Sequence, residues 1–465
     1  MPDALWTRTA VELAALIRDR EVSSREVVQA HLDRIAEVNG QVNAVTLVLE
    51  ETALAGADAA DRSENSGPLH GVPFTIKENI DCVGSPTTSG IPALADALPP
   101  SDAPVVERMK RAGAIPLART NLPELGGRLD TDNPLRGRTF NPWNPALTPG
   151  GSSGGEAAAL ATGMSPIGLG NDILGSLRNP AYCCGITSLK PSAGRIPCVL
   201  SMGVDAGMAV QAMLVEGPMA RSVADLRLGL SVLAGRDVRD PRSVDAPLEG
   251  PVPAPRRAAL ITNIPGFELP AATVAEIRRA GEVLIADGWS VEEVQAPELD
   301  RVNQIWSYVM AADMDEQALQ EQEALVTPQL AALHRQISER TASAPLANSV
   351  VHAERSRLSR VWSEFFGAYP VAVGPTWTCL PWPIDSDLDP ETGMDLTLGT
   401  AHFISPANVL GLPSVALATG VADGLPTGVQ VYADRWREDL CLAAAEQIET
   451  ASPMPTPIDP VPLAD

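Results

Sequence analysis

The sequence predicts an α/β fold, in which a β-sheet is covered by helices on both faces. Short apolar runs typical of strands alternate along the chain with longer stretches of helical periodicity. The 465 residues and a hydrophobic content of 45% are enough for one large core. Because no clear interdomain linker separates these elements, we expect a single domain over residues 1–465.

The N-terminal region, residues 1–68, is predicted to be helical. Residues 9–39 have the pattern of two amphipathic helices, and Gly40 is expected to end the second. Two capping boxes mark the expected helix starts: Thr9 with Glu12, and Ser23 with Glu26.

From residue 69 the sequence pattern changes to short apolar runs separated by Gly and Pro. Residues 69–225 form one block of alternating elements, 299–367 an inserted helical region, and 452–465 a Pro-rich tail that we expect to be flexible. The expected strands are 72–76, 115–118, 165–169, 258–262, 290–294, 371–373, 414–418 and 428–433. The expected helices are 104–112, 155–164, 272–287 and 437–449.

Charge and composition exclude several classes of function. A net charge of −24 argues against nucleic acid as a partner and against anionic membrane surfaces. No apolar stretch reaches the length of a membrane span, and no signal peptide is evident. The six cysteines show no CxxC spacing, so we expect no metal site and no cofactor. A cytoplasmic enzyme is the default expectation.

Lysine is rare in this chain and therefore informative. Lys and Arg total 34, but only Lys77, Lys110 and Lys190 are lysines. Arg keeps its proton in proteins, whereas a desolvated Lys can lose it. Lys77 closes an apolar strand, where burial would lower its pKa and provide a neutral amine as a base. Lys110 is expected on a helix surface and Lys190 in an ordinary turn.

Two serine-containing segments could supply a nucleophile. Residues 148–156 contain four glycines around two serines and run directly into a helix-forming stretch. Residues 168–180 run from a strand into a tight turn at Ser176 and then a short helix. Ser176 would lie beside several free N–H groups, as a nucleophile next to an oxyanion hole requires.

Ser152 also fits the nucleophile elbow of α/β hydrolases, as Gly150-x-Ser152-x-Gly154. That motif needs a preceding strand, but residues 141–149 have the composition of a loop. It also needs a histidine downstream, and none of the histidines there has a suggestive setting: His334, His352 and His402.

Together these segments resemble the amidase signature hydrolases. Segments 71–81, 148–156 and 168–180 stand in that family's order and spacing, and the similarity continues through 184–197, 408–413 and 423–430. It therefore covers most of the chain except the middle. The resemblance implies a large mixed β-sheet core and a serine hydrolase of linear amides or carbamates, with esters also possible.

The resemblance also implies a role for particular residues. The catalytic residues would be Lys77, Ser152 and Ser176, with Ser176 as nucleophile, Ser152 as bridge, and a cis peptide before Ser152. The oxyanion would be bound by the backbone N–H groups of Ile173, Leu174, Gly175 and Ser176. Supporting residues that hold the loop would be Ser153, Asp172 and Arg178.

Leu174 departs from the family pattern, which usually has Gly at this position. We expect its side chain to narrow the acyl site without abolishing catalysis. Half of the aromatic residues lie between 300 and 405, which predicts an apolar pocket and an apolar or aryl substrate. The pocket candidates are Leu174, Trp306, Met310, Trp377 and Phe403.

Two other functions remain open at this point. One is the glutaminase component of a tRNA-dependent amidotransferase, which shares the signature but needs partner subunits and a polar glutamine site. The other is a catalytically impaired binding protein, disabled by Leu174. A homodimer is possible, but nothing in the sequence selects an oligomeric state.

Overall fold

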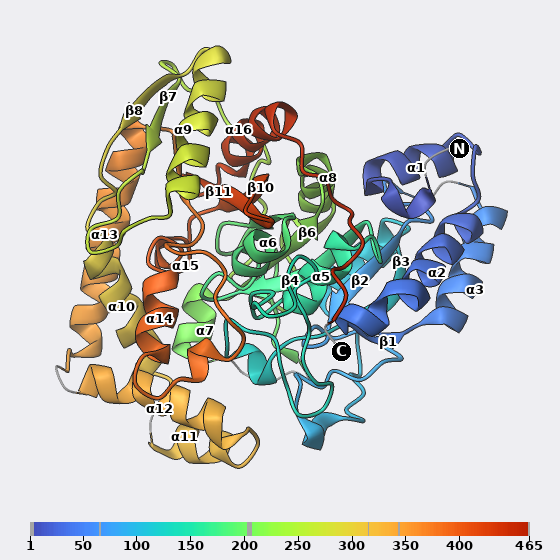
Figure 1. The fold of residues 1–465 in the computed structure, drawn as a ribbon, viewed down its shortest axis with the longest axis horizontal. Helices are drawn as coiled ribbons and strands as arrows, with labels where there is room; N and C mark the ends of the chain where they lie inside the picture. Colours follow the sequence, from blue (N-terminus) through green and yellow to red (C-terminus); the bar gives the residue numbers. More distant parts are fainter. Residues whose placement is uncertain (1–3, 65–66, 202–206, 315, 343–344, 464–465) are drawn as a thin grey trace.

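A mixed β-sheet of 11 strands forms the centre of the molecule (Figure 1). The computed structural model describes residues 4–64, 67–201, 207–314, 316–342 and 345–463. The strand order is β1-β3-β2-β4-β6-β5-β10-β11-β9-β7-β8. The strands are β1 Val45–Val48, β2 Pro73–Lys77, β3 Ile115–Thr120, β4 Ile167–Asp172, β5 Thr187–Lys190, β6 Val215–Ala220, β7 Arg257–Leu260, β8 Ser290–Glu293, β9 Val371–Pro375, β10 Ser414–Ala422 and β11 Leu425–Ala433.

Helices surround this sheet and connect its strands (Figure 1). They are α1 Ala10–Arg18, α2 Ser24–Val42, α3 Glu50–Arg62, α4 Pro104–Arg111, α5 Gly154–Ala161, α6 Arg178–Cys184, α7 Met208–Met213, α8 Val223–Leu233, α9 Ala271–Ala286, α10 Leu299–Ala311, α11 Glu316–Glu323, α12 Pro328–Ala342, α13 Asn348–Ala368, α14 Gly393–Thr400, α15 Ser405–Leu410 and α16 Glu438–Ala451. Strand β2 pairs in parallel with β3 and β4. From β4 onwards, each strand is antiparallel to the next in the order β4-β6-β5-β10-β11-β9.

Alternation along the strands shows that both faces of the sheet are covered. In β9, Val371 and Val373 belong to one buried cluster, and Ala372 between them belongs to another. Successive side chains of a strand point to opposite faces, so each face packs against its own set of helices. The predicted α/β class, with a mixed sheet and helices on both faces, is confirmed.

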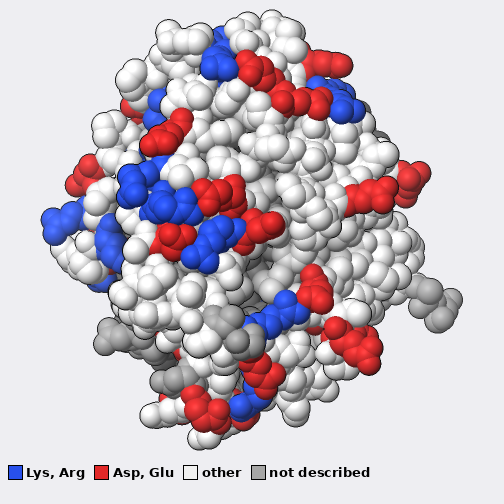
Figure 2. Space-filling view, turned by 90° about the vertical axis from the view of Figure 1, so that its left-hand side faces the viewer, with Lys and Arg blue, Asp and Glu red and all other residues white. Residues whose placement is uncertain are grey.

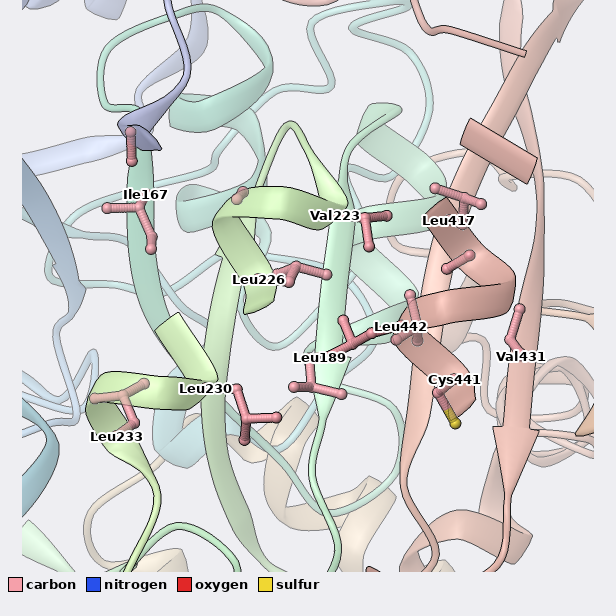
Figure 3. Close-up of a cluster of buried hydrophobic side chains, with 14 of the residues drawn as sticks. Ile167, Leu189, Val223, Leu226, Leu230, Leu233, Leu417, Val431, Cys441 and Leu442 are labelled. Carbon is pink, nitrogen blue, oxygen red and sulfur yellow. The ribbon is translucent and has the colours of Figure 1, made fainter. Parts of the chain in front are cut away.

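Helices α8 and α16 close one of these faces. Figure 3 shows Leu226 and Leu230 of α8 and Leu442 of α16 meeting Leu189 of β5 and Leu417 of β10. All five side chains are at most 3% exposed. This continuous apolar layer fixes the central strands, and with them the strand ends on which the site is built.

The N-terminal region departs from the prediction in two places. Both predicted capping boxes are present, but α2 continues through Gly40 and ends at Asn43. Asn43 adopts the left-handed conformation (φ 52°) that commonly ends helices, whereas a glycine within a helix only weakens it. The region is also not purely helical, because β1 pairs antiparallel with β3 at the sheet edge.

The middle of the chain is helical, whereas the described part of the C-terminal tail has neither helix nor strand. Helices α10 to α13 occupy the region predicted as a helical insertion. Residues 452–463 lack helix and strand and are hydrogen-bonded to the core. The Ile458 N–H donates to the Ala161 carbonyl at 2.9 Å, and Arg34 donates to the Ile458 carbonyl at 3.1 Å.

The surface carries charges of both signs. Figure 2 shows the face on the left-hand side of Figure 1, where basic and acidic residues lie side by side and form no continuous basic surface. Arg357 of α13, for example, pairs with Glu298, which precedes α10, at 2.7 Å. Within the described ranges, none of the helices combines the length and the apolar character needed to cross a bilayer.

Candidate active site

The candidate site lies where β2 and β4 end. These strands are parallel neighbours, so Lys77 at the end of β2 and Asp172 at the end of β4 reach the same edge of the sheet. Carboxyl ends of parallel strands are a common place for ligand sites in α/β folds. Helix α5 begins at Gly154, directly after the glycine-rich turn, and its N-terminus brings Ser152 to this edge.

Lys77 is completely buried and contacts a serine hydroxyl. Its Nζ lies 2.7 Å from Ser152 Oγ and 2.7 Å from Asn171 Oδ1. Phe74 and Ile76 of the same strand face the α8 and α16 layer, so Lys77 points to the opposite face, towards α5. Burial lowers the pKa of Lys77 to about 7, although the nearby carboxylates of Asp172 and Glu156 oppose the shift.

Glu156 is a second buried titratable group beside Lys77. It accepts hydrogen bonds from the hydroxyls of Thr75 and Thr120, the latter at 2.7 Å. Thr120 is the direct strand partner of Lys77, and Thr75 lies two residues before it, so the carboxyl is anchored next to the amine. Burial raises the pKa of Glu156 to about 7. Gly168 leaves room for this carboxyl, because a Cβ there would lie 1.8 Å from Glu156 Oε1.

Sequence reasoning missed the roles of Asn171 and Asn79. Asn171 Nδ2 donates to Asn79 Oδ1 at 3.1 Å, which turns its Oδ1 towards Lys77. The amine must therefore donate to Asn171 Oδ1. The available signal was that both asparagines fall inside the motif segments 71–81 and 168–180.

Asn179 ties the two serine segments together. Its Nδ2 donates to the Gly151 carbonyl at 3.2 Å and to the Leu174 carbonyl at 2.8 Å. Gly151–Ser152 is a cis peptide. The Trp377 indole N–H donates to Asn179 Oδ1 at 2.8 Å and fixes the amide orientation. Nothing in the sequence singled out Asn179.

Ser152 and Ser176 are not hydrogen-bonded to each other in the described part of the chain. Ser176 is 4% exposed and lines a cavity, and Ser152 is 2% exposed. Of the two contacts in the predicted Lys77–Ser152–Ser176 relay, the structure therefore contains the first. Catalytic hydrogen bonds are often long without substrate and shorten when substrate binds.

The loop 173–176 presents fewer N–H groups than predicted. The Gly175 N–H donates to Asp172 Oδ1 at 2.7 Å, so it is already engaged, which leaves Ile173, Leu174 and Ser176 as donors for an oxyanion. Gly175 has φ of 84°, a conformation that favours glycine. Leu174 is not among the residues with positive φ, and its side chain lines the cavity.

Asp172 and Arg178 make polar contacts in this loop, whereas the Ser153 hydroxyl does not. Both charged side chains are fully buried and form an ion pair at 3.1 Å. Burial opposes the charge on Asp172, yet Arg178 holds the pKa of that carboxyl below its ordinary value. The Ser153 hydroxyl is buried and has no hydrogen-bond partner among the described residues. Its predicted supporting role therefore does not take the form of a hydrogen bond.

The cavity next to Ser176 has a volume of about 80 Å³ and a mainly apolar wall. Three of the five predicted pocket residues line it: Leu174, Trp306 and Met310. The other two do not. Trp377 stacks on Trp382 with ring centroids 5.5 Å apart, and Phe403 packs edge-on against Tyr432. The other apolar wall residues are Leu129, Ile173, Met314, Leu333, Ile337, Met394 and Leu398.

Lys190 is not the turn residue that the sequence suggested. It ends β5, is fully buried, and donates to the carbonyls of Pro191 and Leu412, both at 2.7 Å. Burial lowers its pKa to about 7 as well. Lys110, in contrast, pairs with Asp102 at 2.8 Å on the side of α4. Among the described residues, no group of His, Cys, Asp or Glu side chains is arranged to bind a metal ion.

A buried lysine–serine contact in an α/β fold, with a further serine in the wall of an apolar cavity, is an arrangement suited to amide hydrolysis. The chain belongs to the Amidase family, whose model matches residues 26–442. It is 42% identical to an indoleacetamide hydrolase of Bradyrhizobium diazoefficiens, over 96% of this chain and 86% of that protein. The chain is therefore an amidohydrolase acting on amides.

Two further relatives show the breadth of the family. A glutamyl-tRNA(Gln) amidotransferase subunit from Acidothermus cellulolyticus is 31% identical over 96% of this chain and 95% of that protein. A bacterial aryl acylamidase, described as an amidase signature enzyme, superposes with a TM-score of 0.82 at 28% identity, over 96% of this chain and 97% of that chain.

Proposed function

We propose that the chain hydrolyses amides with an apolar or aryl acyl group through an acyl-enzyme on Ser176. The observation that carries this proposal is the fully buried Lys77 amine, 2.7 Å from Ser152 Oγ. Ser176, the proposed nucleophile, lines an apolar cavity. A neutral amine with its lone pair directed at a hydroxyl can act as a base near pH 7.

The proposed reaction has two halves. Lys77 takes the Ser152 proton, Ser152 takes the Ser176 proton, and Ser176 Oγ attacks the amide carbon. The oxyanion is bound by N–H groups of the loop 173–176. Ser152 then gives a proton to the substrate nitrogen, and the C–N bond breaks to release the amine product. A water molecule, activated by Lys77 and Ser152, hydrolyses the acyl ester on Ser176.

The cavity supports an aryl substrate in particular. Its wall combines Leu174 and Trp306 with three methionines, whose sulfur atoms and flexible chains contact aromatic rings well. Indoleacetamide, the substrate named for the Bradyrhizobium relative, is therefore the first amide to test. Aryl carbamates and esters present the same carbonyl chemistry, and we propose them as secondary substrates.

A second candidate is the glutaminase half-reaction of a tRNA-dependent amidotransferase, which the Acidothermus relative favours. Glutamine carries an ammonium and a carboxylate, and both would need charged partners in the acyl site. The charged side chain among the described residues of this cavity wall, Arg128, is already paired with Asp387 at 2.8 Å. A tRNA partner would also favour a basic surface, whereas the net charge is −24.

The deciding experiment is a substrate panel on the wild type and on Ser176→Ala. The panel contains indoleacetamide, phenylacetamide, a p-nitroanilide, an aryl carbamate, an ester and glutamine. We expect the aryl amides to have the highest kcat/KM and Ser176→Ala to abolish turnover and fluorophosphonate labelling. Preference for glutamine would support the second candidate. Absence of both turnover and labelling in the wild type would support the impaired binding protein.

A further inference from the structure

The polar side chains in the cavity wall are nearly all engaged by the protein. The Arg128 guanidinium is held by carboxylates at 2.8 to 3.0 Å. His334 Nδ1 lies 2.7 Å from a glutamine side-chain oxygen. The Trp306 indole N–H donates to a backbone carbonyl at 3.2 Å. None of these groups is available to a ligand without breaking an existing contact.

Apart from the proposed nucleophile Ser176, the exception among the described wall residues is Thr397. It lies on α14 and lines the same cavity as Ser176. It is 8% exposed, and its Oγ1 is buried and has no hydrogen-bond partner among the described residues. Leaving a buried hydroxyl unpaired costs about 1–3 kcal/mol, so such a group in a native protein calls for an explanation.

We propose that Thr397 is a specificity-determining residue, whose hydroxyl accepts a hydrogen bond from a single N–H on the aromatic ring of the acyl group. This inference rests on the proposed function and narrows its substrate class to aryl amides whose ring carries one N–H donor. A threonine in a helix populates two side-chain rotamers, so the hydroxyl can turn to the cavity when a ring fills it. The surrounding methionines, Met310, Met314 and Met394, would contact the faces and edges of that ring.

The test compares two amides of nearly the same shape. Indole-3-acetamide carries the ring N–H, and benzothiophene-3-acetamide has sulfur in its place. We expect wild-type kcat/KM to favour the indole by roughly 10- to 100-fold, as expected for one hydrogen bond to an otherwise unpaired buried group. Thr397→Val should reduce this ratio to near 1 by weakening the indole alone, and Thr397→Ser should retain it.

Thr400→Val is the matched control on the same helix. The Thr400 hydroxyl contacts Cys379 Sγ and Trp382 Nε1, both at 3.4 Å, and Thr400 does not line the cavity. Its loss should leave the substrate ratio unchanged. A ratio near 1 in the wild type, or a ratio preserved in Thr397→Val, would overturn the proposal. A change in thermal stability alone would assign Thr397 a purely structural role and would also overturn it.

The proposed function and this inference fail in different ways. Hydrolysis of both amides without discrimination rejects only the role of Thr397. If neither amide is hydrolysed, the proposed function fails, and the role of Thr397 is still decided by binding. Ser176→Ala should then bind the indole more tightly than the benzothiophene, and adding Thr397→Val should remove that difference. Equal dissociation constants of the two amides for Ser176→Ala, or a preference that survives Thr397→Val, would reject the role of Thr397.

Discussion

Two lysines of this protein share an environment but differ in what they contact. Lys77 and Lys190 each end a strand, are fully buried, and have a pKa that burial lowers to about 7. Lys190 donates to two backbone carbonyls, which can only accept. Lys77 contacts a hydroxyl that can give up a proton. Burial alone therefore makes a neutral amine available, and the chemistry of the partner decides whether that amine can act as a base.

The strongest test of this comparison is the pair Lys77→Met and Lys190→Met. We expect Lys77→Met to lower kcat/KM by roughly 10²- to 10⁴-fold, the usual contribution of a general base. Lys190→Met should keep kcat within a few-fold, but leave the Pro191 and Leu412 carbonyls unpaired, at a cost of about 1–3 kcal/mol each. Kinetics and denaturant unfolding measure both. Turnover that survives in Lys77→Met would remove the base from the proposed mechanism.

The pH dependence of Ser176 labelling shows which lysine acts as the base and in which direction its neighbours shift its pKa. Fluorophosphonate labelling of Ser176 needs neutral Lys77, so its rate should rise about tenfold per pH unit below an inflection near 7 and then level off. Asp172 and Glu156 face Lys77 and favour its charged form, so Glu156→Gln should move the inflection to lower pH. Lys190→Met should leave the inflection in place. An inflection that follows Lys190 instead would contradict the assignment.

The comparison also shows where sequence reasoning ends. The position of Lys77 after an apolar strand predicted its burial and its lowered pKa, because a strand pattern specifies which residues face the core. A strand also precedes Lys190, yet the local sequence predicts an ordinary turn there. Its carbonyl partners come from Pro191 and from Leu412, more than 220 residues away in sequence, and only the folded sheet brings Leu412 close.

Local sequence patterns could not predict other contacts of the site, because these also form only in the folded chain. Asn179 links Gly151 to Leu174, and Asp172 already engages the Gly175 N–H, contacts that depend on the exact path of two loops. Motif spacing placed Ser152 and Ser176 in the right segments. It could not indicate which aromatic residues reach the cavity, because Trp377 differs from Trp306 only in tertiary packing.

The smallest expected effect is one that both lysines share. Between about pH 7 and 10.5 each lysine is neutral when folded and charged when unfolded. The unfolded state then binds the extra proton, so raising the pH stabilises the folded state by up to about 1.4 kcal/mol per pH unit for each lysine. Below pH 7 both states are protonated, and the slope disappears.

The unfolding free energy of the wild type minus that of each Lys→Met variant isolates this slope, because the buried cysteines and tyrosines titrate equally in both proteins and cancel. We expect the same positive slope for Lys77→Met and for Lys190→Met, although only the first loses activity. A slope for one lysine alone would mean that the other keeps its proton in the fold. If Lys77 were that residue, its contact with Ser152 would be a charged hydrogen bond, and Ser176 would need a different base.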